Sequence, residues 1–396
     1  MSSVVSLQQT EVLRRLPPYV FAELDRLKAA ARARGAELID LGIGSPDLPI
    51  APAILDALSA AAHDSSAHGY PPFRGVPRFF EAIERFMQSR FDVTIDAPRE
   101  AIALSGAKEG LAQLVMALCG PGDLALIPAI YYPVYARSAW LSGADVSWVP
   151  MRASDGFQLD LDAIPAADAR RARVLIVNYP NNPTGARVEL EFYERAVAFA
   201  RRHDVVLVSD LAYSELTFGG TPAPSALECS EARDVTIEFH SLSKTFSMAG
   251  LRIGFAVGNA DAIKALAAYR SNVGYGTPTA VQHAAAYALD HRRELVPPKV
   301  QAYQARRDAI VAALGAAGWE ITAPPASMYL WLTVPAGVDD WTWVQTLMDE
   351  DGVVVTPGVA FGDGGRGYFR ISLVRDAGTL AHAATTIAAR RARMTI

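Results

Sequence analysis

The sequence predicts an α/β protein, with a mostly parallel sheet flanked by helices and a second, smaller α+β unit. Short apolar runs rich in β-branched residues recur through the middle of the chain, and helical patterns separate them. Buried parallel strands have this composition because helices cover both of their faces. The two ends of the chain carry a different mixture of elements. The expected strands lie at residues 101–104, 124–127, 174–177, 205–208, 235–239 and 253–257.

The stretch between the first two runs shows the helical pattern most clearly. Its apolar residues recur at helical spacing at Leu111, Leu114, Val115 and Leu118. A glycine–proline pair at 120–121 then ends the pattern. A strand, a helix and a second strand in this order predict an α/β unit with right-handed crossovers.

The two ends of the chain predict the smaller unit. The first 49 residues hold an arm, a helical FAELDRLKAAARARG and a strand-like ELIDLGIG. Towards the C-terminus a long charged helix, VQAYQARRDAIVAALGAAGW, precedes strand-like YLWLTV, VVVTP and YFRISLV. We therefore expect a large domain at 50–285 and a small domain at 286–396, to which part of 1–49 contributes.

The composition argues against several kinds of partner. Of 396 residues, 51% are hydrophobic and 20% charged, and the net charge of −5 gives no sign of a nucleic-acid partner. No stretch approaches the ~18 apolar residues of a membrane span, and no secretory signal is recognised at the N-terminus. Cys119 and Cys229 form neither a metal-ligand pattern nor a disulfide framework. Two free thiols favour a cytoplasmic protein without a metal site.

Polar residues follow four of the expected strands, although the strands themselves carry almost none. In an open α/β sheet, ligands bind beyond the carboxyl ends of the strands. These polar groups are therefore expected to meet at one site. They are Ser105–Lys108, Asn178–Gly185, Asp210 with Tyr213, and His240–Lys244.

The first two of these segments have structural as well as functional interpretations. SGAKEG leads into a helix N-terminus, whose free N–H groups and dipole favour an anion. The alternative is a plain N-cap by Ser105. PNNPTG indicates a rigid turn that can include a cis proline, and such a turn can aim Asn182 at a ligand.

Asp210 follows a run of apolar residues, where a carboxylate is poorly solvated and costly unless it is paired. A protonated ring nitrogen would suit it as a partner, because the pair stabilises both charges. The alternative is that Asp210 caps the next helix.

SLSKTFSMAGLRIG is the most informative stretch. Lys244 directly follows an expected buried strand, and a desolvated lysine has a lowered pKa and becomes a nucleophile. The hydroxyls of Ser241 and Ser243 and the fork of Arg252 would suit a phosphate dianion. The alternative is a surface loop that carries a lysine and an arginine.

Four segments together resemble the class I/II aminotransferases of pyridoxal-phosphate (PLP) fold type I. They are S-G-A-K, P-N-N-P-T-G, D-L-A-Y and S-L-S-K-T-F-S-M-A-G-L-R-I-G. The resemblance extends from LPPYVF at 16–21 to FRISL at 369–373. It implies a PLP enzyme that moves an amino group between an L-amino acid and a 2-oxo acid.

The resemblance also implies roles for residues around the cofactor ring. Lys244 would hold PLP as a Schiff base and move a proton between the substrate Cα and the cofactor. Asp210 would pair with the pyridinium nitrogen, and Tyr213 and Asn182 would bind the ring's phenolic oxygen. Tyr132, in AIYYPVY, would stack on the ring; its alternative is a core aromatic.

The same resemblance implies a phosphate site and a shared dimer. The groups that would hold the phosphate are the N–H groups of Ala107 and Lys108, the Ser241 and Ser243 hydroxyls, and Arg252. The Lys108 side chain itself is expected to face phosphate or solvent, with no aromatic neighbour. Tyr70, in HGYPPFRG, resembles a tyrosine that reaches the phosphate of a second copy, so a homodimer with shared active sites is expected.

For the substrate, Arg370 matches the arginine that takes the α-carboxylate as a bidentate pair, with Asn182 beside it. Gly44 would let the N-terminal segment close over that carboxylate. Segments such as DLGIGSPDLP and ASMYLWL are similar to the branch with LL-diaminopimelate and alanine aminotransferases. Tyr19 and Asn272 match substrate-pocket positions of the diaminopimelate enzymes.

The side-chain specificity stays open among diaminopimelate, alanine and aspartate types, with 2-oxoglutarate or pyruvate as acceptor. A dicarboxylate substrate needs a second cationic group, for which Arg74 and Arg270 are candidates.

Three alternatives compete with transamination. A C–S lyase, decarboxylase or condensing synthase can share this fold, because the reaction depends on which Cα bond lies perpendicular to the ring. A PLP-sensing transcription regulator would need a basic DNA-binding segment, which the first ~40 residues do not supply. A dehydrogenase would need the G-x-G-x-x-G spacing that SGAKEG lacks.

Overall fold

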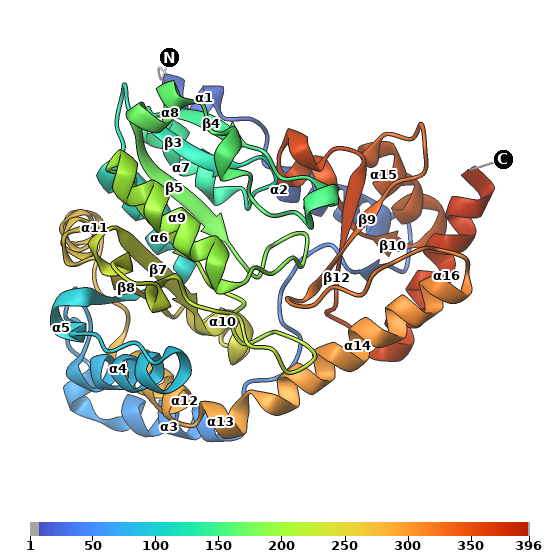
Figure 1. The fold of residues 1–396 in the computed structure, drawn as a ribbon. Helices are drawn as coiled ribbons and strands as arrows, with labels where there is room; N and C mark the ends of the chain where they lie inside the picture. The colour runs from blue at the N-terminus through green and yellow to red at the C-terminus, as the bar shows by residue number, and fades with distance from the viewer. Residues whose placement is uncertain (1–7, 395–396) are drawn as a thin grey trace, which may run out of the picture.

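The computed structural model describes residues 8–394 and confirms the α/β prediction. Its largest element is a seven-stranded sheet, six of whose strands run parallel (Figure 1). In spatial order the strands are β2 (Ala101–Leu104), β8 (Gly254–Gly258), β7 (Thr236–Ser241), β6 (Val206–Asp210), β5 (Ala172–Asn178), β3 (Leu124–Pro128) and β4 (Asp145–Val149).

Two features of this sheet differ from the sequence prediction. The run at 253–257 is β8, which pairs antiparallel with both β2 and β7. An apolar run reports burial on both faces but not strand direction, and the short connection from β7 to β8 suits antiparallel neighbours. The sequence prediction missed β4, an edge strand whose residues are partly exposed, so it has no continuous apolar run.

Helices cover both faces of the sheet, and alternate strand residues pack against each layer. The predicted helix after the first strand is α6, with Leu111 and Leu114 buried and Leu118 as its last residue. One layer contains α6 (Ala107–Leu118), α7 (Val134–Ser142) and α11 (Ala260–Val273). The other contains α3 (Pro52–His63), α4 (Pro77–Phe91), α9 (Leu190–His203) and α12 (Thr279–Asp290). Shorter helices are α5 (Ala97–Glu100), α8 (Ala166–Arg171), α10 (Leu242–Thr245) and α13 (Arg292–Leu295).

A second unit is built from both ends of the chain. Leu24 and Leu41 share one hydrophobic core with residues between 303 and 388. Figure 1 shows the long helix α14 running from the first unit to the second. The three-stranded antiparallel sheet is β11 (Thr356–Pro357), β12 (Tyr368–Ser372) and β9 (Tyr329–Thr333). A parallel pair joins β1 (Ile39–Asp40) to β10 (Val353–Val354). The helices are α2 (Val20–Ala33), α14 (Pro297–Ala316), α15 (Asp340–Asp351) and α16 (Ala377–Met394). The short helix α1 (Glu11–Arg15) instead contacts α7 of the first unit.

The domain limits at 49/50 and 285/286 remain predictions. Both cysteines are buried and free. Within residues 8–394, no helix combines the length and apolar composition needed to cross a membrane. In the same part of the chain, no three His, Cys, Asp or Glu side chains gather as they would around a metal ion.

Candidate active site

A cavity of about 420 Å³ lies where the two units meet, at the carboxyl ends of β5, β6 and β7 and the start of α6. Most of the site residues expected from the sequence line it. They are Tyr19, Gly44, Ala107, Lys108, Tyr132, Asn182, Asp210, Tyr213, Ser241, Ser243, Lys244, Arg252 and Arg370. A larger cavity of about 920 Å³ shares Tyr19 with it but holds none of the other expected residues. The smaller cavity is therefore the candidate active site.

Lys244 lies in α10, the single helical turn that directly follows β7. Its Nζ donates a hydrogen bond to the Gly44 carbonyl oxygen at 2.5 Å. Burial is the main cause that lowers the Lys244 pKa, so more of the amine is neutral than for a lysine in water. Because Lys244 faces the cavity and its neighbour Ser243 is buried, the surface-loop alternative is wrong.

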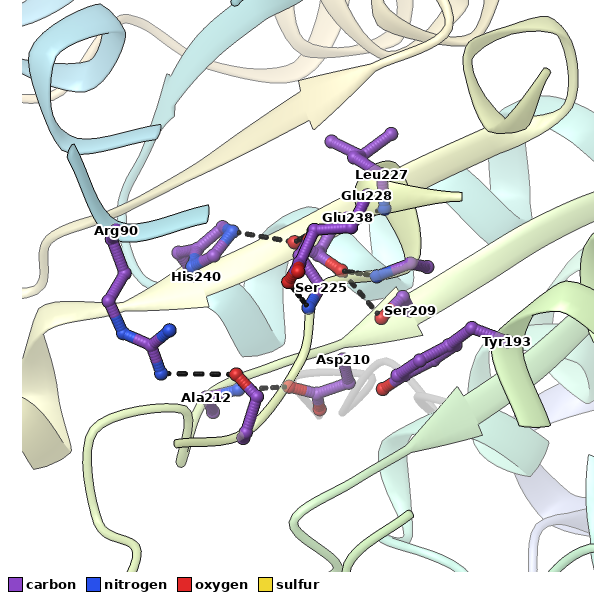
Figure 2. A network of polar contacts seen from close by, with 12 residues as sticks. Arg90, Tyr193, Ser209, Asp210, Ala212, Ser225, Leu227, Glu228, Glu238 and His240 are labelled. Atoms are coloured by element: carbon purple, nitrogen blue, oxygen red, sulfur yellow. Dashed lines mark hydrogen bonds and ion pairs between the residues drawn. The ribbon is translucent and has the colours of Figure 1, made fainter. Parts of the chain in front are cut away.

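Asp210 ends β6 and is 6% exposed. Tyr135 donates its hydroxyl to one carboxylate oxygen at 2.6 Å. The Ala212 N–H donates to the other oxygen at 3.2 Å, as Figure 2 shows. Burial raises the Asp210 pKa to about 6, against the opposing effect of the Tyr135 hydrogen bond. The segment after Asp210 is a turn, so the helix-cap alternative is wrong.

Asp210 forms no salt bridge with any residue between 8 and 394. A buried carboxylate that accepts hydrogen bonds but has no cation beside it is costly. It is therefore suited to pair with a cationic atom of a bound ligand.

A buried polar network lies behind Asp210, on the opposite face of the sheet (Figure 2). Glu238 of β7 is fully buried and accepts hydrogen bonds from Ser209, Ser225, the Ala226 N–H and His240. The Ser209 bond ties β6 to β7 one residue before Asp210. The network thus holds the strand end that presents Asp210 to the cavity.

The start of α6 forms an anion cradle. Its N-cap is Gly106, with φ of 96°, and no side chain caps it, so the Ser105 alternative is wrong. A Cβ on Gly106 would lie 2.4 Å from Nη2 of Arg252, so glycine is needed for this approach. The N–H groups of Ala107 and Lys108 therefore face the same space as the Arg252 guanidinium and the residues Ser241 and Ser243.

Arg370 of β12 is 2% exposed and reaches the opposite side of the cavity. Its two Nη atoms donate to Asn182 Oδ1 and to the Gly42 carbonyl oxygen, each at 2.7 Å. Its Nε is buried without a hydrogen-bond partner, and no carboxylate between residues 8 and 394 pairs with it. A buried guanidinium in this state is suited to an anionic ligand. The predicted rigid turn is confirmed, with cis bonds before Pro180 and Pro183.

Sequence reasoning missed Tyr135 and Tyr329, which line the cavity. Asn178 belongs to a segment expected to reach the site, and its amide donates to the Asp210 carbonyl oxygen at 2.8 Å. The residues 131–135 include three tyrosines, and their sequence does not show which of them face the site. Tyr329 stands in the quoted segment ASMYLWL, but only the fold brings that strand to the cavity.

Lys108 differs from its expected environment. Its Nζ lies 5.6 Å from the Tyr19 ring centroid and 5.8 Å from that of Tyr132. The expectation that this side chain has no aromatic neighbour is therefore wrong. Its ammonium lies at the rim of the cavity beside these rings, where it can meet a substrate.

Four residues proposed from the sequence lie outside the cavity of their own chain. Tyr70 is 81% exposed, and Asn272 donates to the Ala268 carbonyl oxygen. Arg74 donates to backbone carbonyls of residues 99 and 101. Arg270 is buried, with one Nη atom unpartnered. Within one chain, neither arginine recognises a second substrate carboxylate in this cavity.

Comparison with known proteins agrees with this arrangement. Residues 36–387 match the family model of aminotransferase class I and II. An LL-diaminopimelate aminotransferase from Desulforudis audaxviator is 44% identical over 93% of this chain and 94% of its own. The substrate-bound BacF structure from Bacillus subtilis has a TM-score of 0.93 and 35% identity over 98% of both chains. A mutant Thermus thermophilus aspartate aminotransferase has a TM-score of 0.90 and 28% identity over 97% of this chain and 100% of its own.

The chain therefore belongs to the class I and II aminotransferases. Its activity is that of a transaminase, in preference to the lyase, decarboxylase, synthase, sensor and dehydrogenase alternatives.

The buried Asp210 carboxylate predicts a pH-dependent stability. Its pKa in the folded protein, about 6, lies above the ordinary value of 3.8, so its favourable contribution is lost as the pH rises through 6. Asp210→Asn removes this titration. In the cofactor-free protein we expect the variant to gain about 2 kcal/mol relative to the wild type between pH 4 and pH 8. Urea unfolding at the two pH values measures this gain. Asp56→Asn, at an exposed position, is the control, and an equal difference at both pH values for Asp210→Asn would contradict the prediction.

Proposed function

We propose that this aminotransferase uses PLP, bound in the 420 Å³ cavity. The observation that carries the proposal is a buried carboxylate without a salt bridge among residues 8–394, in the same cavity as a helix N-terminus and an arginine. Asp210 suits a protonated ring nitrogen, and the Gly106 cradle with Arg252 suits a phosphate. Lys244 lies in the same cavity with a lowered pKa. The residues present thus fit the cofactor that the family implies.

Each residue has a distinct task in this proposal. When bound, PLP supplies an electron sink for the bonds at the substrate Cα. Tyr132 would cover the ring face, while Tyr213 and Asn182 would hold the phenolic oxygen. Arg370 binds the substrate α-carboxylate through its fork.

Lys244 Nζ would take the proton from the substrate Cα and pass it to the cofactor, and in the second half-reaction it would move a proton in the opposite direction. Its lowered pKa favours the neutral amine, which is the form that can accept this proton. The Gly44 carbonyl, 2.5 Å away, holds the amine in place between these steps.

We propose LL-diaminopimelate as the amino donor and a 2-oxo acid such as 2-oxoglutarate as the acceptor, in the cytoplasm. The proposal is supported by relatives named for that substrate, 41–44% identical to this chain. The cavity lining also includes groups of both signs, the Lys108 ammonium and the Asp25 carboxylate. The distal end of diaminopimelate carries a carboxylate and an ammonium group that would complement them.

The direct test is a spectral titration of the PLP-loaded protein. The donors are alanine, aspartate, glutamate, an aromatic amino acid and LL-diaminopimelate, each followed by its matching oxo acid. LL-diaminopimelate is expected to convert the bound cofactor to its amino form, and a 2-oxo acid to restore it. Lys244→Ala is expected to bind PLP but lose turnover by several orders of magnitude. A near wild-type rate in this variant would remove Lys244 from its role, and conversion by another donor alone would replace the proposed substrate.

Two substitutions separate recognition of the two ends of the substrate. Arg370→Lys replaces a fork by a point charge and is expected to raise KM about tenfold for every amino acid. Lys108→Met is expected to lower kcat/KM for diaminopimelate about fivefold, consistent with roughly 1 kcal/mol for an exposed pair, and to spare alanine. Steady-state kinetics with both substrates measure these effects. An equal loss for both substrates in Lys108→Met would place Lys108 outside distal recognition.

We further propose a homodimer in which each chain contributes Tyr70 to the site of the other. Tyr70 is 81% exposed and stacks on the exposed Tyr275, with ring centroids 4.4 Å apart. Phe73, also exposed, stacks on Tyr275 as well, with ring centroids 5.5 Å apart. Exposed aromatic groups of this kind favour an interface, and Tyr70 does not line the 420 Å³ cavity of its own chain.

Complementation between inactive variants tests the shared site. Tyr70→Ala and Lys244→Ala are each expected to be impaired, because each lacks one part of every site. When the two are mixed and allowed to exchange chains, half of the dimers hold one intact site, so activity should approach about a quarter of the wild type. Wild-type mixed with Lys244→Ala is the control for dilution. If chains exchange and no activity returns, the shared site is wrong.

A further inference from the structure

Tyr329 is a buried residue of the cavity wall to which no task has been assigned above. It begins β9 and is 2% exposed. Its strand belongs to the three-stranded sheet of the second unit and pairs with β12, which carries Arg370. The cavity thus receives Tyr329 and Arg370 from one small sheet, Asp210 from the large sheet, and Lys244 from the helical turn α10 that follows β7.

The ring of Tyr329 supports the arginine. The Arg370 guanidinium carbon lies 4.2 Å from the Tyr329 ring centroid and 4.7 Å from that of Phe361. At these distances the negative ring faces stabilise the cation and limit the directions in which its fork can point. This contact needs an aromatic ring at residue 329 but no hydroxyl.

The hydroxyl of Tyr329 makes a separate contact. Its oxygen lies 2.9 Å from the Tyr213 hydroxyl oxygen, and both side chains are buried. A hydroxyl has one proton to donate and can accept others. If Tyr213 donates to the cofactor's phenolic oxygen, its own oxygen is left to accept, and Tyr329 must be the donor between them.

The backbone of Gly44 also lies close to the Tyr329 hydroxyl. A Cβ on Gly44 would lie 2.1 Å from the Tyr329 hydroxyl oxygen, so only glycine leaves the oxygen in place. The Gly44 carbonyl in turn accepts from Lys244. Tyr329 therefore adjoins the segments that hold the amine, the arginine and Tyr213.

We propose that Tyr329 is a positioning residue for transamination, with its ring supporting Arg370 and its hydroxyl donating to Tyr213. This inference rests on the proposed PLP site. The two parts of the side chain act on different steps. The ring affects binding of the substrate carboxylate, and the hydroxyl affects the electronic state of the cofactor through Tyr213.

Two substitutions separate these parts. Tyr329→Phe keeps the ring, so KM should stay within about twofold while kcat falls about tenfold, as for the loss of one buried hydrogen bond. Tyr329→Leu also removes the ring, so KM should rise for every amino acid. In substrate-free, PLP-loaded Tyr329→Phe, the pH midpoint of the cofactor's visible absorption should rise, because a weaker donor stabilises the phenolate oxygen less. A rise in KM with unchanged kcat in Tyr329→Phe would overturn the role of the hydroxyl.

A double-mutant cycle tests whether the hydroxyl acts through Tyr213. Tyr213→Phe with Tyr329→Phe should be no slower than Tyr213→Phe alone, because the group through which Tyr329 acts is already missing. A further tenfold loss in the double variant would show that Tyr329 acts elsewhere.

Tyr303→Phe is the matched control. Tyr303 is a buried tyrosine of the same hydrophobic core, and it does not line the cavity. Its hydroxyl has no hydrogen-bond partner among residues 8–394. It should leave kcat and the absorption midpoint unchanged, and a shift equal to that of Tyr329→Phe would overturn the inference. If wild-type protein shows no cofactor absorption or no transamination, the proposed function fails. A functional wild type with an unshifted Tyr329→Phe overturns this inference alone.

Discussion

The structure depends on keeping charged groups in a cavity that offers them little water and few partners. Asp210 and Arg370 are almost fully buried, and neither forms a salt bridge between residues 8 and 394. Isolated buried charges destabilise a fold, by several kcal/mol each in real proteins. The two-layer packing on the large sheet and the separate core of the second unit supply the stability that tolerates this cost. A ligand with a cationic ring atom and a substrate with a carboxylate would relieve it.

The backbone determines where those charges meet. Parallel strands bring their carboxyl ends to one edge, so Asn178, Asp210 and Ser241 converge although the chain separates them by 31 to 63 positions. The network of Glu238 then ties β6 to β7 behind Asp210, and its bonds to residues 225 and 226 anchor a distant loop to the same place. Arg370 arrives from a different sheet, held by Asn182 and the Gly42 carbonyl. The site therefore lies between the two units, and its geometry depends on how they pack against each other.

Local sequence was sufficient where a residue's environment is set by its own strand or helix. Three features could be predicted, because burial and free helix N–H groups follow from nearby residues: Lys244 after an apolar run, Asp210 at a strand end, and the start of α6 at a glycine. The direction of β8 and the existence of the edge strand β4 could not be predicted, since both depend on pairing with distant segments. Tyr135 and Tyr329 were missed for the same reason. Their hydroxyls meet Asp210 and Tyr213 only after α7 and β9 have docked.

Two glycines show how closely the backbone and the charged side chains are fitted. A Cβ at Gly106 would meet the Arg252 guanidinium, and one at Gly44 would meet the Tyr329 hydroxyl. In each case the space that a side chain would fill is used by a polar group of the cavity. Gly106 also has a positive φ, so glycine is needed there both for the backbone conformation and for the space near Arg252. At Gly44, glycine is needed only for the space near the Tyr329 hydroxyl. Alanine at Gly44 would displace the Tyr329 hydroxyl without straining the backbone, whereas alanine at Gly106 would both displace the Arg252 guanidinium and strain the backbone. We therefore expect alanine at Gly44 to affect ligand binding before stability, and alanine at Gly106 to affect both.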